Sequence, residues 1–374
     1  MQSFELIDLI VFLGISQGIF LAIVIQVIQN KNRFANRTLS LILIIASIML
    51  TGRFFYTIET DNETFFRLAL FVDILVFIFG PLLYLYYRRL IFNEKSKYIL
   101  HYTYFIPAAG MLVYHFWTYQ FSYNEFVLLV QNGSLTLSFL IIEAVGILFN
   151  LYLGYRCFRL LGVYQKEEKN NLSYSQNLAR YLNTILITGG LFLLLWIISF
   201  ILGYGFNIYS SFLSYNSIWI VVCVFVYIIG FYSLKQPDIF RMPLSIKKHF
   251  KNKERLDDEM IKKLETRLEK LMVNEKIYLN HKLTLVDLAK GLNTSTNNVS
   301  WLLNNIHKCT FYDYINTYRV KAFVEKIEND EHHHHTLLAL SMDSGFNSKS
   351  TFNKAFKTVI KDTPSNYIKK LNTM

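Results

Sequence analysis

The distribution of apolar residues divides the chain into two parts. Up to about residue 234, apolar residues run in long blocks separated by short polar segments, whereas after it polar and charged residues dominate. A helix needs roughly 20 apolar residues to cross about 30 Å of hydrocarbon, because it rises about 1.5 Å per residue. Blocks of this kind lie at residues 6–29, 38–56, 68–90, 99–121, 135–158, 182–205 and 212–234. We therefore predict an all-α protein whose residues 1–234 form a domain of seven transmembrane helices.

Basic residues in the loops indicate how this domain is oriented. The first, third and fifth loops contain Lys31, Arg33, Arg37, Arg88, Arg89, Lys95, Lys97, Arg156, Arg159, Lys166, Lys169 and Arg180. The alternate segments contain only Arg67. Basic loops stay on the cytoplasmic side, so the sequence predicts a multi-pass protein of the inner (cytoplasmic) membrane with its N-terminus outside and its C-terminal tail in the cytoplasm. If the block at 38–56 did not span, this alternation would break.

Charge and cysteine content limit the functions that residues 235–374, the C-terminal tail, are expected to have. Residues 235–374 contain 24 Lys and Arg against 16 Asp and Glu and so carry +8 of the net charge of +11, which favours nucleic acid or anionic headgroups as partners. The three cysteines are far apart in sequence and suggest neither a disulfide framework nor a thiolate zinc site. Residues 235–259 are basic, contain Pro237 and Pro243, and fit a juxtamembrane linker.

The next segment, residues 256–276, has a helical pattern. An apolar stripe at 3,4,3 spacing consists of Ile261, Leu264, Leu268 and Leu271. Two heptads are too few for a coiled-coil assignment. Two roles stay open for the stripe, namely packing against the following domain and contact between subunits of a homodimer.

An internal near-repeat follows. The segments "LVDLAKGLNTSTNNVSWLLNN" and "LLALSMDSGFNSKSTFNKAFK" begin at Leu285 and Leu337. In each, a small residue (Ala289, Ser341) is followed four residues later by a turn residue (Asn293, Gly345) and then by a polar helix start. The second helix of each carries apolar anchors, namely Val299, Leu302 and Leu303 in the first and Phe352 and Phe356 in the second. A small residue lets two helices cross closely, and the turn residue tolerates positive φ, so the spacing predicts two helix-turn-helix units at about 283–305 and 335–357.

These motifs resemble a known family. "LTLVDLA", "FYDYINTYRVKAF", "GFNSKSTFNKAFK" and "TPSNYIKKL" occur in the order and spacing typical of the DNA-binding domain of AraC/XylS-type transcription regulators. The resemblance covers about residues 260–374, and the whole chain is similar to the membrane-anchored bacterial variety. It implies two helix-turn-helix units joined by a long helix, a double-stranded DNA partner and no cofactor. Where the family usually has glycine at two helix ends, this chain has Lys308 and Lys361.

Residues that face DNA in such units are found at the start and on the exposed side of each second helix. The sequence predicts DNA contacts at Thr296, Asn297, Ser300, Trp301, Ser348, Lys349, Ser350, Asn353, Lys354 and Lys357. The alternative for each residue is a solvated helix face, and for Trp301 partial burial. Arg319 matches a family arginine, for which a structural ion pair and a phosphate contact both stay open.

Other functional classes have less support in the sequence. The run His332–His335 with Asp330 and Glu331 fits a solvated linker better than a metal site, because adjacent residues cannot all converge on one ion. The sequence contains no phosphate-binding loop, nucleophile elbow or zinc-helix motif, so we predict no enzyme and no metal. The pair Gly189–Gly190 in an apolar block is typical of close helix packing.

Two interpretations of the whole chain follow. The favoured one is a membrane-bound transcription regulator that binds promoter DNA and senses a ligand or membrane partner. The alternative is a membrane receptor or transporter whose cytoplasmic tail is regulatory and does not bind DNA. Charges inside predicted spans are costly and often line a protein interior. Arg53, Asp73 and Glu143 lie at similar predicted depth, so we expect them to form an outward-facing sensor pocket above a kink at Gly80–Pro81. The alternative is that Arg53 and Asp73 extend to the interface and only Glu143 is buried.

Overall fold

The computed structural model describes residues 6–27, 32–57, 63–92, 99–208, 215–235 and 256–371. Every regular element in these segments is helical, and their one extended pairing is an isolated antiparallel bridge between Leu172 and Thr284. The chain forms two compact units, one of residues 1–162 and 177–245 and one of residues 163–176 and 246–374. The predicted all-α class is therefore confirmed. The domain boundaries stay a prediction, and the second unit additionally takes in a short segment, 163–176, from the middle of the chain.

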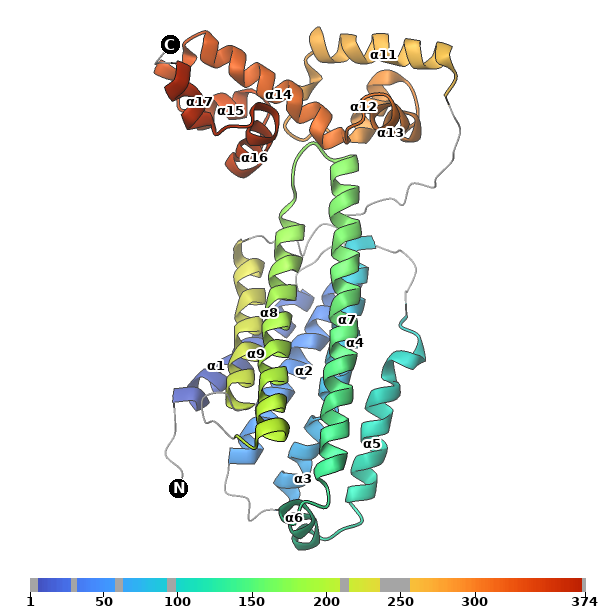
Figure 1. The fold of residues 1–374 in the computed structure, drawn as a ribbon, viewed down its shortest axis with the longest axis vertical. Helices are drawn as coiled ribbons and strands as arrows, with labels where there is room; N and C mark the ends of the chain where they lie inside the picture. Colours follow the sequence, from blue (N-terminus) through green and yellow to red (C-terminus); the bar gives the residue numbers. More distant parts are fainter. Residues whose placement is uncertain are drawn as a thin grey trace. The chain divides into compact units, whose positions relative to one another are not determined.

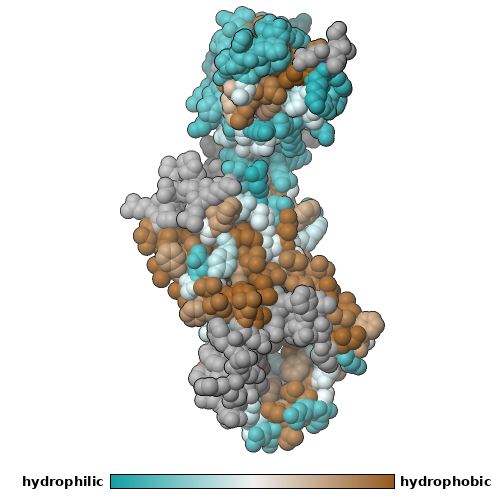
Figure 2. Space-filling model, turned by 90° about the vertical axis from the view of Figure 1, so that its left-hand side faces the viewer, coloured by the Kyte–Doolittle hydropathy of each residue, from teal (hydrophilic) through white to brown (hydrophobic). Residues whose placement is uncertain are grey.

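The first unit is a bundle of long helices (Figure 1). Its elements are α1 (Leu6–Val27), α2 (Arg33–Thr57), α3 (Glu63–Val72), α4 (Leu75–Phe92), η1 (Tyr102–Phe105), α5 (Ile106–Thr118), α6 (Tyr123–Gln131), α7 (Thr136–Asn171), α8 (Asn177–Phe200), η2 (Ile201–Gly205) and α9 (Tyr215–Lys235). Helix α7 ends in the second unit. In Figure 2, hydrophobic residues cover much of the visible surface of the first unit. Large apolar side chains that are exposed include Phe12, Ile23 and Leu148. A surface of this kind suits a lipid environment better than water.

Among the residues that the structure describes, five helices are long and apolar enough to cross a membrane. They cover Leu6–Val27, Arg33–Gly52, Leu70–Phe92, Thr136–Asn171 and Asn177–Gly205, and a shorter apolar helix covers Ile218–Ser233. Within the predicted span 99–121, α5 has 13 residues and a length of about 20 Å, which is less than the hydrocarbon thickness. The count of seven spans therefore stays a prediction.

The predicted third span is interrupted, and the interruption lies at Asp73 and Ile74, between α3 and α4. Helix α4 continues through Pro81. A Cβ at Gly80 would lie 2.5 Å from Oδ1 of Asn150, so glycine permits the close approach of α4 to α7. The helix break thus places the backbone of Asp73 outside regular structure, while Gly80 serves packing.

The second unit contains a different set of short helices. They are α11 (Asp258–Val273), η3 (Ile277–Leu279), α12 (Leu285–Leu292), α13 (Thr296–Asn305), α14 (Phe311–Glu328), η4 (Glu331–His333), α15 (Leu337–Asp343), α16 (Lys349–Ile360) and α17 (Pro364–Leu371). Two apolar cores hold them together, and α14 contributes to both, with Phe311 and Ile315 in one core and Phe323 and Ile327 in the other. The stripe of α11 is buried in the first core, which confirms the predicted helix and shows that it packs against its own domain.

Candidate DNA-binding surface and sensor cavities

The pair α12 and α13 is joined by a tight, well-capped turn. Thr284 starts α12 with a capping box, in which its hydroxyl accepts from the N–H of Asp287 and the Asp287 carboxylate accepts from the N–H of Thr284. Asn293 ends the helix with φ of 53°, and Ser295 caps α13. The buried Ala289 accepts a backbone hydrogen bond from Thr294 at 3.0 Å. The small residue, the left-handed turn and the polar cap that the sequence predicted are all present.

The pair α15 and α16 repeats this geometry. Gly345 has φ of 92°, and the N–H of Phe346 donates to the carbonyl of buried Ser341 at 3.1 Å, the same five-residue relation as in the first pair. Ser348 caps α16 by accepting from the N–H of Thr351. A Cβ at Gly345 would lie 2.5 Å from the carbonyl oxygen of Tyr278. Glycine is therefore required here both by the turn and by the contact with the first half of the domain.

The structure resolves the alternatives for Arg319. Its side chain is fully buried on α14, and its five N–H donors meet oxygen acceptors on Tyr278, Asn280, Ser173 and Asn316. Burial lowers the pKa of this guanidinium to about 10. None of these acceptors is a carboxylate, and the buried group does not face solvent. Arg319 therefore makes neither of the contacts expected from the sequence and instead binds carbonyl, amide and hydroxyl oxygens.

The predicted DNA contacts lie on α13 and α16, but not in equivalent settings. Thr296, Asn297, Ser300 and Trp301 are half-buried on α13, and for Trp301 this matches the alternative interpretation. Lys349, Ser350, Asn353, Lys354 and Lys357 are exposed on α16. Ser348 is half-buried and its hydroxyl already caps the helix. The surface of α16 is thus the more basic and accessible of the two, and contact of any of these residues with DNA stays a prediction.

The two lysines at positions where the family has glycine keep the glycine-type backbone. Lys308 has φ of 53°, and Lys361, the C-cap of α16, has φ of 62°. Left-handed residues end helices by allowing the chain to turn away from the axis. The departure from the family pattern therefore changes the side chain and leaves the helix end in place.

The histidine run is more compact than the sequence suggested. Asp330, His332 and His333, here called the histidine turn, have potential ligand atoms within 4.8 Å of one another. The rings of His332 and His333 are 4.2 Å apart between centroids and tilted by 35°. The sequence indicated that four adjacent histidines cannot all converge on one ion, but it did not reveal that Asp330, His332 and His333 bring their potential ligand atoms together.

Among the cavities lined by described residues of the first unit, two bear on the predicted pocket and on the Gly189–Gly190 pair. Asp73 and Glu143 both line a cavity of about 430 Å³, together with Tyr114, His115 and Trp196. His115 is buried, and its Nε2 has no hydrogen-bond partner among the described residues. The structure therefore brings two of the three predicted pocket residues to one cavity, whereas the side chain of Arg53 lies outside the described side chains.

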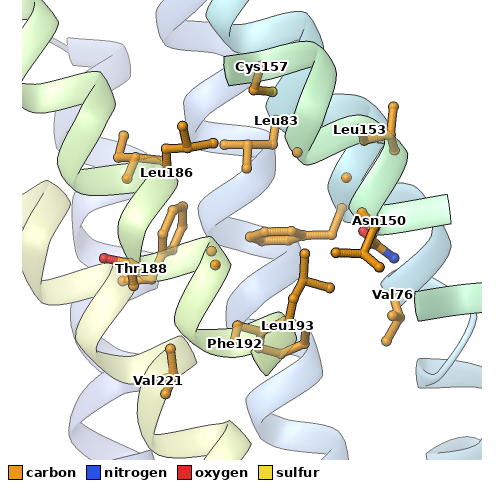
Figure 3. Close-up of a pocket in the computed structure, with 18 of the residues that line it drawn as sticks. Val76, Leu83, Asn150, Leu153, Cys157, Leu186, Thr188, Phe192, Leu193 and Val221 are labelled. Carbon is orange, nitrogen blue, oxygen red and sulfur yellow. The ribbon is translucent and has the colours of Figure 1, made fainter. Parts of the chain in front are cut away.

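The second cavity, of about 340 Å³, is almost wholly apolar (Figure 3). Its two labelled polar residues, Asn150 and Thr188, donate to carbonyls of their own helices. Gly189 and Gly190 line this cavity, and a Cβ on either would meet no atom within 4 Å. The expectation that this pair serves close helix packing is therefore wrong, because the glycines border open space.

Comparison with known proteins assigns part of the second unit. Residues 288–370, from within α12 to α17, match the family model described as Helix-turn-helix domain. This match supports DNA-binding transcription regulation of the AraC type, in agreement with the sequence motifs. Searches of curated proteins and of solved structures found no match to the chain.

Proposed function

We propose that the protein is a membrane-bound, one-component transcription regulator that binds promoter DNA through both helical pairs. The observation that carries this proposal is the helix-turn-helix match over residues 288–370, which includes α13, α15 and α16. The exposed Lys349, Lys354 and Lys357 of α16 add a basic surface suited to phosphates. We expect no enzymatic activity and no cofactor.

Two recognition helices in one chain should enter successive major grooves about one helical turn, or roughly 34 Å, apart. One protomer is then expected to protect two short sub-sites spaced about 10 base pairs centre to centre. The test is selection of DNA by the full chain from a random duplex pool, followed by footprinting. Replacing Asn297 or Lys349 by alanine should change base preference at one sub-site, whereas selection without any enriched sequence would oppose sequence-specific binding.

The long apolar helices of the first unit support a location in the cytoplasmic membrane. The charge bias of the loops supports an external N-terminus and a cytoplasmic tail. Reporter fusions after Asn124 and Tyr209 should then report outside, and fusions after Lys97, Lys169 and Lys251 inside. An external signal at Lys251 would separate the tail from chromosomal DNA and remove the proposed function.

The cavity lined by Asp73 and Glu143 supports a sensory role for the first unit. Carboxylates and a buried imidazole in a mostly apolar cavity offer a small ligand both apolar contact and a few orienting polar groups. A simple tether would need one span, and the five long apolar helices exceed that requirement. The signal that the first unit senses is then a ligand bound in this cavity or a membrane partner.

The second candidate is a receptor or transporter whose tail regulates it without binding DNA. The observation in its favour is the pair of internal cavities in the first unit. DNA binding by the full chain separates the two candidates, because the second predicts none. A homodimer contact is compatible with either candidate, and chemical crosslinking in membranes would detect it.

A further inference from the structure

Helix α7 is longer than a membrane crossing requires. It has 36 residues and a length of about 54 Å, against about 30 Å of hydrocarbon, and it continues 13 residues beyond the predicted end of its span at Phe158. Its last turns belong to the second unit. Residues 172–176, which follow α7 and belong to the same unit, are here called the docking turn. At residue 177 the chain begins α8 and returns to the first unit (Figure 1).

The docking turn is inserted at the start of the first helical pair. Ser173 is fully buried, and both its N–H and its hydroxyl donate to the carbonyl of Leu283, at 3.3 and 2.7 Å. Leu172 forms the isolated antiparallel bridge with Thr284, the residue that caps α12. The turn therefore holds the segment that leads into α12.

Ser173 also completes the surroundings of Arg319. The guanidinium donates to the Ser173 carbonyl at 2.9 Å and to its hydroxyl at 3.0 Å, while Asn316 donates to the same carbonyl at 3.0 Å. The remaining Arg319 donors bind the carbonyls of Tyr278 and Asn280 and the amide oxygen of Asn316. If the docking turn left, two of five donors on a buried charged group would need new acceptors. Such groups are costly to leave unpaired, so an occupied and an open state should be distinct.

The second helical pair is contacted by the same segment. The hydroxyls of Ser175 and Thr351 are 3.1 Å apart, and Thr351 lies in the first turn of α16. The buried carboxylate of Glu168, near the end of α7, accepts from the N–H of Gln176 and interacts electrostatically with Lys354. The docking turn thus bridges both helical pairs, and the end of α7 places a buried carboxyl near a lysine that we expect to face DNA.

We propose that the docking turn is an internal inhibitor of DNA binding, whose release from its contacts with Arg319 connects the state of the membrane helices to the DNA-binding domain. The proposal rests on the proposed function. The docked turn fixes α12 relative to α16, so the two recognition helices cannot adjust to successive grooves. The turn is continuous with α7 and α8, so movement of either helix acts on it directly.

A disulfide across the contact tests the inference in the full chain, reconstituted in lipid nanodiscs. Ser175→Cys and Thr351→Cys are combined in a chain carrying Cys157→Ala, Cys223→Ala and Cys309→Ala. The close approach of the two hydroxyls puts the replaced side chains within the range of a disulfide. Oxidation should give an intramolecular bond, seen as a mobility shift, and each single cysteine variant serves as the control.

The oxidised protein should bind a random-sequence duplex of about 30 base pairs at least tenfold more weakly than the same protein after reduction. Ser173→Ala, which removes the hydroxyl bonded to Leu283 and Arg319, should instead strengthen DNA binding, with Ser365→Ala on exposed α17 as its matched control. Failure of the disulfide to form, or equal DNA binding before and after reduction, would overturn the inference while leaving the proposed function intact. Absence of DNA binding in both redox states would overturn both.

Discussion

Replacement of Lys357 by alanine isolates the electrostatic part of DNA recognition. Lys357 is exposed in the last turn of α16, away from the N-terminal turn that reads base edges, so we expect its ammonium to meet a phosphate. Each phosphate neutralised on duplex DNA contributes about 0.9 to the slope of log K against log salt. The variant should therefore bind all sequences more weakly, and its slope should be shallower by about 0.9. Between 50 and 200 mM salt its loss of affinity would then be roughly threefold smaller than that of the wild type.

Fluorescence anisotropy of the full chain with labelled duplexes of two unrelated sequences measures these slopes. The control is Lys263→Ala on α11, whose exposed ammonium is 2.7 Å from the carboxylate of Glu259. It changes the net charge equally and should leave the slope unchanged. A Lys357→Ala slope equal to that of the wild type, or an equal change in the control, would refute a phosphate contact at this position.

Four further predictions concern stability, pH, sensing and metal. Gly345→Ala should destabilise the second unit by about 1–3 kcal/mol, because Gly345 has a positive φ and lies close to the Tyr278 carbonyl. The second unit should then be digested by trypsin at a lower temperature. Gly162→Ala, at an open helical position, should leave this temperature unchanged. Burial raises the pKa of the Glu168 carboxyl to about 7, so docking of the turn is favoured below about pH 4.5 and weakens as the pH rises to 7. Glu168→Gln keeps this side chain neutral and should therefore stay docked at pH 8. The variant should bind DNA more weakly than the wild type at pH 8 and equally at pH 5. Glu143→Gln and Asp73→Asn should alter induction of target genes at unchanged protein level, and unchanged induction in both would remove support for the cavity. Chelators should leave DNA affinity unchanged, and a loss that zinc restores would assign a metal to the histidine turn.

Local rules in the sequence were sufficient to predict the turns of the DNA-binding domain. Asn293 and Gly345 follow small residues at fixed spacing, and a tight turn between crossing helices leaves few other solutions. The apolar stripe of α11 likewise predicted a helix, while its partner became known only when its leucines were found in the first core. Periodicity shows which face is buried and not what covers it.

The docking turn could not be predicted in this way. Ser173 lies in a short polar segment with no distinctive spacing, and its acceptors and donors are more than 100 residues away. The one available signal was on α14, where Arg319 follows Ile315 and precedes Phe323 at four-residue intervals on a buried face. An arginine in that position requires several buried acceptors. The sequence did not indicate that the loop between α7 and α8 supplies two of them.

The interior of the first unit was equally hard to predict. A glycine pair in an apolar helix fits close packing and open space alike, and the cavity beside Gly189 and Gly190 depends on side chains from several helices. Asp73 and Glu143 were expected at similar depth from counting residues along the spans, and both do line one cavity. The break between α3 and α4 at Asp73 was not foreseen, because the surrounding residues are uniformly apolar.

Selection of DNA by the full chain in lipid nanodiscs tests the central claim most directly. The protein is incubated with a random duplex pool at about 150 mM salt, bound DNA is amplified over several rounds, and the enriched duplex is footprinted. We predict an enriched sequence with two protected sub-sites about 10 base pairs apart, in accordance with two recognition helices in one chain. No enrichment over the starting pool would contradict the account and favour a membrane protein with a regulatory tail.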